Sequence, residues 1–424
     1  MKNRRIIFRV IILFLVLFLA CCARPQVVVK EPGAPATEEV TPPGKPPDSE
    51  RPLFAPFVRE INRFSIGCVL PLSGPHAEVG GKSLEAILLA AGIFEARNKS
   101  PWKIIAQDSR STPQQTKAAI EYLAEKENVI AIIAVVGAAE APDAAREAER
   151  LQVPLILITS REGVSLASEY VFQHFLTPSQ QVRAIVSYAV NNMNSAIFSA
   201  LYPADEYGEE MMKIFREEVA RVGGRLEKMV PYGVNKTDFT EEINKLTGYQ
   251  ISLARKTTKK TEPRKKISLD FEALFIPDSY RRVQMISSQL AFYDVRDIKL
   301  MGTSLWNSPY LLKRGAEYLE GAVFADSFFP YTFYREANDF VDVFYTAYGR
   351  DPENIEALAY DTAGIVCSAI EKRDIRTRQQ LIASLVNMDA YHGATGTTSF
   401  GYDRVSQKTP FILKIKNGKL EQVK

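Results

Sequence analysis

Residues 64–75, with the sequence FSIGCVLPLSGP, indicate the fold class most directly. Phe64 to Leu70 is an apolar run of strand-favouring residues, and the turn formers Pro71-Leu72-Ser73-Gly74-Pro75 end it. Apolar side chains then recur at the spacing of one helix face, at Leu84, Ile87, Leu88, Ala91 and Phe94. A strand, a turn and an amphipathic helix in this order are typical of the first unit of a wound α/β sheet.

The alternation of strand and helix continues toward the C-terminus. Val129 to Val136 and Val153 to Thr159 are continuous apolar runs, which predict parallel strands covered by helices on both faces. A second series of strands and helices begins near Pro178. We therefore predict an α/β protein with two doubly wound parallel-sheet lobes joined by a hinge.

Two local patterns predict where elements begin and turn. Thr112, Pro113 and Gln115 have the arrangement of a helix start with a capping box. Asn417-Gly418 lies between two short apolar runs, 411–416 and 420–423, and predicts a C-terminal hairpin.

The first 22 residues predict export. A basic start is followed by the apolar run Val10 to Ala20, too short to span a membrane and typical of a signal peptide, which we place at residues 1–20. Leu17-Phe18-Leu19-Ala20-Cys21 resembles a bacterial lipobox, so we expect Cys21 to carry the lipid, with Cys22 as the alternative. An ordinary cleaved signal with two unmodified thiols is the other interpretation.

Residues 21–56 predict a lipid-anchored linker. Nine prolines lie between Ala23 and Pro56, and polar residues fill most of the gaps. Such a chain buries too little apolar surface to fold, and proline favours extended conformations. About 368 residues follow, enough for two domains.

The charge of the chain limits the classes of partner that it is expected to bind. The formal charge is +3, and removal of a signal with four basic and no acidic residues leaves −1. A nearly neutral chain argues against nucleic acid as a partner. Gly248 to Lys266 forms a basic insertion, interpreted first as a solvated loop and alternatively as a contact for an anionic lipid, an anionic cell-wall polymer or an acidic partner. Cys68 and Cys367 are expected to be buried thiols, and a disulfide between them is the alternative.

The sequence predicts no catalytic centre, metal site or cofactor. His76, His174 and His392 lack metal-ligand spacing to another His or Cys. No G-x-S-x-G or G-x-G-x-x-G motif follows a strand, and Gly81-Lys82-Ser83 lacks the preceding glycine of a phosphate loop. An enzyme is therefore the weaker hypothesis.

A ligand-binding cleft is the stronger hypothesis. In open α/β sheets, ligands bind at the carboxyl ends of strands. Hydroxyls and N–H groups at helix starts there suit an anion such as a carboxylate. The candidate ligand-binding residues are Ser73, Gly74, Gly137, Ala138, Ala139, Thr159, Ser160, Tyr202, Asp278 and Thr303.

The chain from about Asn62 onward resembles type I periplasmic binding proteins of the leucine/isoleucine/valine kind. The resemblance is carried by 69–75, 131–139, 153–160, 201–208, 237–239 and 398–403. Within that superfamily, 273–278, 289–294, 302–307 and 318–324 are similar to the penicillin-binding-protein activator lipoproteins, which stimulate peptidoglycan synthases. The activators of well-studied enterobacteria carry a helical-repeat domain before the binding-protein-like domain, and this chain has the linker there instead.

The resemblance implies how the two lobes share the chain. Three crossovers are expected, near Pro178, Asp326 and Gly393. Lobe 1 would comprise 57–178 and 327–392, and lobe 2 would comprise 179–326 and 393–424. In amino-acid-binding members, the loops that match Ser73, Gly137 to Ala139 and Thr159-Ser160 hold the ligand's carboxylate and amine.

We therefore expect a non-enzymatic, lipid-anchored protein that grips a small polar, amino-acid-like solute between two lobes for an ABC importer. It would lie on the periplasmic side of a bacterial membrane, with the outer membrane favoured. The alternative is an outer-membrane lipoprotein that activates a peptidoglycan synthase through protein–protein contacts.

Overall fold

The computed structural model describes residues 60–93, 100–249, 267–296, 298–372 and 374–423. Residues 59–424 form one compact unit of the chain. The predicted signal peptide and linker, with Cys21 and Cys22, lie outside the described residues, as do residues 250–266 of the basic insertion and Phe94. None of the helices in the described ranges combines the length and the apolar character that a membrane span requires.

The first sheet is wholly parallel and has the strand order β2-β1-β3-β4-β5. Its strands are β1 Asn62–Leu70, β2 Lys103–Asp108, β3 Val129–Val135, β4 Leu155–Ile158 and β5 Val171–Gln173. The helices between them are α2 Ala77–Ala90, α3 Pro113–Glu125 and α4 Ala141–Leu151. Every residue of β3 is buried, as expected for a central strand covered on both faces.

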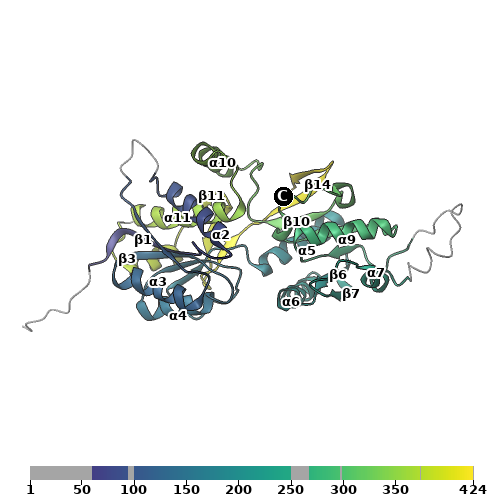
Figure 1. The fold of residues 1–424 in the computed structure, drawn as a ribbon, viewed down its shortest axis with the longest axis horizontal. Helices are drawn as coiled ribbons and strands as arrows, with labels where there is room; N and C mark the ends of the chain where they lie inside the picture. Colours follow the sequence, from purple (N-terminus) through teal and green to yellow (C-terminus); the bar gives the residue numbers. More distant parts are fainter. Residues whose placement is uncertain (1–59, 94–99, 250–266, 297, 373, 424) are drawn as a thin grey trace, which may run out of the picture. The chain divides into compact units, whose positions relative to one another are not determined.

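Helices cover both faces of this sheet (Figure 1). Ile66 and Cys68 of β1 pack on one face against α2 and against α11 Asn354–Lys372. Val69, which points the other way, packs against α3 and α4. Two helices later in the chain are α10 Arg335–Tyr348 and α12 Arg378–Val386.

The second sheet has the order β15-β14-β10-β9-β8-β6-β7. Its strands are β6 Ile197–Pro203, β7 Arg225–Tyr232, β8 Ala273–Phe275, β9 Lys299–Gly302, β10 Val323–Asp326, β14 Phe411–Lys416 and β15 Lys419–Gln422. The accompanying helices are α5 Pro178–Met193, α6 Glu206–Arg221, α7 Thr240–Thr247 and α9 Tyr280–Phe292, with 3₁₀ turns η1 Ser304–Trp306 and η2 Ala316–Leu319.

This second sheet is also covered on both faces. One core joins β6 and β8 to α5 and α6, and the other joins them to α7 and α9. The strands from β10 to β7 are parallel, whereas the hairpin of β14 and β15 is antiparallel and adds to the edge at β10. Asn417 and Gly418 both have positive φ in its turn, so the predicted hairpin is confirmed.

A small third sheet was not predicted. It consists of β11 Tyr391–Gly393, β12 Gly396–Phe400 and β13 Ser406–Lys408, all antiparallel. Val405, just before β13, bridges Gln173 of the first sheet. The predicted division of the chain between two lobes stays a prediction.

The predicted fold class is confirmed, with local corrections. Thr112 caps α3 by accepting the N–H of Gln115 at 3.4 Å, but the reciprocal bond that completes a capping box is absent there. Complete boxes occur instead at Thr177 and Thr377, each with a glutamine three residues later. Strands β5 and β7 were missed, the first because it is short and the second because half of its residues, including the charged Arg225 and Glu227, are exposed.

Candidate functional site

The ten predicted binding residues fall into two groups at strand ends. Seven follow β1, β3 and β4, which are neighbours in the first sheet, so their loops meet at one carboxyl edge. Tyr202, Asp278 and Thr303 lie at the carboxyl ends of β6, β8 and β9, which are neighbours in the second sheet. Parallel pairing therefore gathers each group at one edge.

Two glycines bring helix starts close to these edges. A Cβ at Gly80 in the first turn of α2 would lie 2.1 Å from the carbonyl oxygen of Pro71, which follows β1. Gly208 in α6 repeats this arrangement, because its Cβ would lie 1.9 Å from the carbonyl oxygen of Pro203 at the end of β6. Both positions exclude any side chain, so glycine is needed for this close approach.

Asp108, at the end of β2, organises the loop that holds Ser73. Its Oδ1 accepts N–H bonds from Leu72 at 2.9 Å, Ser73 at 3.3 Å and Arg110 at 2.9 Å. Its Oδ2 accepts the Ser73 hydroxyl at 2.5 Å. The bond from Ser73, opposed by partial desolvation, holds the pKa of Asp108 below its usual value.

Sequence reasoning missed Asp108. The sequence does contain a signal for it, because Asp108 ends the strand that pairs with β1. Polar side chains at the carboxyl ends of neighbouring parallel strands lie at the same edge of the sheet. The consequence for Ser73 is direct: its hydroxyl proton, expected to serve a ligand anion, is donated to Asp108.

Glu140 occupies the loop after β3 in a similar way. Its buried carboxylate accepts the N–H of Gly137 at 3.0 Å and the Thr116 hydroxyl at 2.8 Å. Within the described ranges, the N–H groups of Ala138 and Ala139 donate to no other protein group. These two N–H groups are therefore the donors that this exposed loop offers to a ligand.

Thr159 and Ser160 end β4 in different environments. Thr159 is buried, its hydroxyl accepts the N–H of Arg161 at 3.4 Å, and its carbonyl oxygen accepts the side chain of Gln173 at 2.8 Å. Ser160 is exposed beside it. Thr159 thus fixes the loop, while Ser160 presents its hydroxyl at the edge.

At the second sheet, Asp278 accepts the Tyr232 hydroxyl at 2.6 Å and the Ser279 N–H at 2.5 Å. Burial, reinforced by Asp278, raises the pKa of Tyr232. Arg282 lies 3.8 Å from Asp278 and donates to two backbone carbonyl oxygens. Asp278 therefore belongs to a cluster of polar and charged side chains at this edge that already hydrogen-bond to groups of the chain itself.

Tyr202 and Thr303 are buried at the same edge of the second sheet. The Tyr202 side chain packs in the core with α5 and α6, and burial raises its pKa. Thr303 is close to Tyr207, whose pKa burial raises to about 12. These two predicted residues are therefore buried beneath this edge of the sheet and do not lie on its exposed surface.

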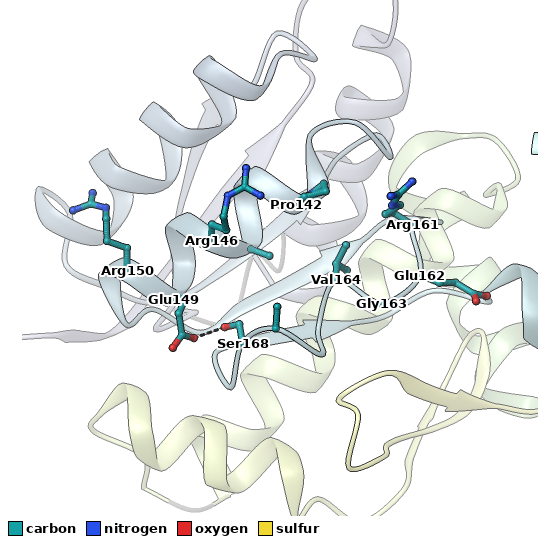
Figure 2. Close-up of a pocket in the computed structure, with 11 residues that line it drawn as sticks. Pro142, Arg146, Glu149, Arg150, Arg161, Glu162, Gly163, Val164 and Ser168 are labelled. Carbon is teal, nitrogen blue, oxygen red and sulfur yellow. Dashed lines mark hydrogen bonds between the residues drawn. The ribbon is translucent and has the colours of Figure 1, made fainter. Parts of the chain in front are cut away.

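A further cavity lies beside the first sheet, away from the predicted residues. This groove lies between α4 and the loop after β4 (Figure 2). Its volume is about 610 Å³. Glu149 accepts the Ser168 hydroxyl at 2.5 Å, Arg146 pairs with Asp143, and Arg150 pairs with Glu147. None of the ten predicted residues lines this groove, and most of its charges already have partners.

The described residues include two buried thiols. Cys68 and Cys367 are free and buried, and burial raises the pKa of Cys68 to about 12. In these ranges, no cluster of three or more His, Cys, Asp or Glu side chains is arranged to hold a metal ion.

Comparison with known families assigns the chain. The profile of the family described as "Periplasmic binding protein" matches residues 64–252 and 283–419, which is most of the chain. The chain belongs to the periplasmic binding protein family. The predicted resemblance is thereby confirmed at the level of the family, and the family is one of binding proteins of the periplasm. A search of curated proteins gave no match.

Solved structures of periplasmic binding proteins share the fold. LivJ, the branched-chain amino acid transporter substrate-binding protein of Streptococcus pneumoniae, in complex with isoleucine, is 22% identical with a TM-score of 0.65, covering 85% of this chain and 98% of its own. The leucine-binding protein LivK of Thermotoga maritima is 21% identical with a TM-score of 0.64, covering 85% and 97%.

A solute-binding protein of an ABC transporter from R. palustris, in complex with benzoate, is 16% identical with a TM-score of 0.62, covering 85% of this chain and 96% of its own. At these identities, the likeness establishes the fold and leaves the ligand of this chain open.

Proposed function

We propose that this protein holds a small polar, amino-acid-like solute at the carboxyl edges of its two sheets and delivers it to an ABC importer without transforming it. The observation that carries the proposal is the gathering of polar groups from β1, β3 and β4 at one edge of a binding-protein fold. The isoleucine and benzoate complexes of two proteins with this fold support a small carboxylated or amino-bearing solute.

The protein is proposed to act from the periplasmic side of a membrane. The lipobox-like stretch that ends at Cys21, with Cys22 as the alternative, would supply two or more acyl chains, enough for stable anchoring. The proline-rich residues 21–56 would hold the folded unit away from the bilayer, with the outer membrane favoured.

Thermal denaturation tests solute binding. The full chain is heated with each of the twenty amino acids and with small carboxylates and amines in turn. A bound solute stabilises the folded state by mass action, by about 2.7 kcal/mol at a hundredfold excess over Kd, so the melting temperature rises with concentration. We expect Ser73→Ala and Ser160→Ala to reduce that rise, and exposed Asp389→Asn to leave it unchanged. No rise with any solute would contradict the proposal.

A second candidate is activation of a peptidoglycan synthase through direct contact. Two of the stretches that resemble the activator branch, and the segment between them, expose large apolar side chains. Leu305 is 47% exposed, Tyr318 is 43% exposed, and Tyr310, which lies between these two stretches, is 55% exposed. Exposed aromatic residues are common in protein interfaces. This candidate would be favoured if the protein captures a synthase in a pull-down and Tyr310→Ala and Tyr318→Ala abolish that capture, while no solute raises the melting temperature.

A further inference from the structure

The hydrogen bond between Ser73 and Asp108 determines what Ser73 can bind. A serine hydroxyl has one proton, and that proton lies in the 2.5 Å bond to Asp108 Oδ2. Toward a ligand, Ser73 Oγ is then left with acceptor lone pairs only. A ligand carboxylate also presents only acceptors, so it gains nothing at this position.

Asp108 itself offers a further acceptor. Three backbone N–H groups occupy Oδ1, whereas Oδ2 receives only the Ser73 proton among the described residues. A carboxylate oxygen has two lone pairs, so one on Oδ2 remains for a ligand. The carboxyl group is 29% exposed, which leaves it within reach of a ligand.

The nearest cation does not neutralise this carboxylate. Arg110 Nε lies 4.0 Å from Asp108 Oδ2, and the Arg110 side chain is 67% exposed. A pair of this length at the surface is weak, because water screens it. The N–H groups of Leu72 and Ser73 donate to Asp108, and the N–H of Gly137 donates to Glu140. These three donors therefore already serve carboxylates of the chain itself.

We propose that Ser73 and Asp108 form a subsite for a cationic hydrogen-bond donor, an ammonium or guanidinium group of the solute. A carboxylate on the solute is dispensable and would bind, when present, at the N–H groups of Ala138 and Ala139. This inference rests on the proposed binding function and specifies which end of the solute the first strand's loop recognises.

Matched probe compounds test the ammonium and the carboxylate of an amino acid one at a time. Isoleucine carries both charges, 2-methylbutylamine keeps only the ammonium, and 3-methylpentanoate keeps only the carboxylate on the same hydrocarbon body. Benzylamine and benzoate form a second pair. Isothermal titration of the full chain is expected to show each amine binding at least roughly tenfold more tightly than its matching carboxylate, because only the amine can donate to both acceptors.

Asp108→Asn is the decisive variant. Its amide oxygen can still accept the three backbone N–H groups, while its NH₂ can donate to Ser73 Oγ and free the serine proton. The affinity for the amines should fall at least roughly tenfold and the affinity for the carboxylates should rise, so the order of preference reverses. Exposed Asp389→Asn removes the same charge elsewhere and should leave the preference unchanged.

Ser73→Ala serves as a second variant in case Asp108→Asn does not fold. It keeps the Asp108 charge and removes one acceptor, so the affinity for the amines should fall severalfold. The Asp108 charge should still exclude carboxylates from this subsite. A carboxylate that binds the unaltered protein as tightly as its amine, or a preference that Asp108→Asn leaves unchanged, would overturn this inference and leave the proposed function standing. Absence of binding for every probe and every amino acid would overturn both.

Discussion

A hydroxyl group links two buried charges in the C-terminal part of the chain. Lys408 Nζ donates to Thr395 Oγ1 at 2.5 Å and to Thr398 Oγ1 at 2.7 Å, and Thr395 Oγ1 donates to Asp361 Oδ2 at 2.5 Å. Burial lowers the pKa of Lys408 to about 8 and raises the pKa of Asp361. These charge-assisted hydrogen bonds hold the third sheet to α11.

Burial also determines how the two thiols of the folded part react. Cys68 is fully buried, and burial raises its pKa to about 12, while burial raises the pKa of Cys367 as well. Because the thiolate is the reactive form, we expect neither residue to be alkylated by iodoacetamide at pH 8 in the folded protein. Both should be alkylated in concentrated urea, which mass spectrometry of the peptides would show. Alkylation of Cys68 without urea would contradict this prediction.

At the scale of elements, helix starts are fixed by close contacts with the strands before them. The first turns of α2 and α6 each carry a glycine against the carbonyl oxygen of a proline at or just after the preceding strand's end. The same strand–proline–glycine arrangement thus occurs once in each large sheet. It draws the N–H groups of the helix start toward the edge where ligands bind in this kind of fold.

Adjacent glycines in α2 give a matched test of this contact. Gly80→Ala would place a Cβ 2.1 Å from the Pro71 carbonyl oxygen, whereas nothing lies within 4 Å of a Cβ at Gly81. We expect Gly80→Ala to lower the free energy of unfolding by about 1–3 kcal/mol through overpacking. Gly81→Ala should raise it by up to about 1 kcal/mol, because alanine favours the helix. Urea denaturation measures both, and equal effects would contradict the argument.

At the scale of the whole molecule, Asp326 joins parts of the chain that are far apart in sequence. This buried residue ends β10 and accepts hydrogen bonds from Asn307, just after η1, at 2.6 Å, from Asn354 of α11, and from the Ser327 N–H at 2.6 Å. Asn354 begins α11, which packs on the first sheet, and β10 belongs to the second sheet. Asp326 therefore connects elements of both large sheets where the chain passes between them.

The titration of Asp326 gives stability a pH dependence. Burial, opposed by these hydrogen bonds, raises its pKa to about 7, well above its value in the unfolded chain. The folded state then binds more protons than the unfolded state between about pH 4 and pH 7, so the free energy of unfolding falls as pH rises through that window. From pH 5 to pH 8, this group contributes a loss of about 2–3 kcal/mol.

The experiment compares urea denaturation at pH 5 and pH 8. Asp326→Asn removes the titration, so its free energy of unfolding should fall less over this interval than that of the unaltered protein. Exposed Asp389→Asn is the control and should keep the full decrease. Equal decreases in all three proteins would show that Asp326 does not titrate in this range.

The amino-acid sequence was sufficient to predict the fold class, the order of most strands and helices, and the strand ends where polar residues gather. Alternating apolar periods, turn formers and Asn417-Gly418 act locally, so they are visible without tertiary structure. Short or half-exposed strands such as β5 and β7 depend on their neighbours for pairing, and their own residues carry too little pattern to reveal them.

What the polar residues at those strand ends can bind depends on tertiary contacts, which the sequence does not reveal. Ser73 and Asp108 are 35 positions apart, and Asp361 and Thr395 are 34 apart, yet each pair shares a hydrogen bond. A hydroxyl can donate one proton only, so the partner that receives it determines whether the group can serve an anion or a cation. That partner is chosen by strand order and helix packing, which bring distant residues together.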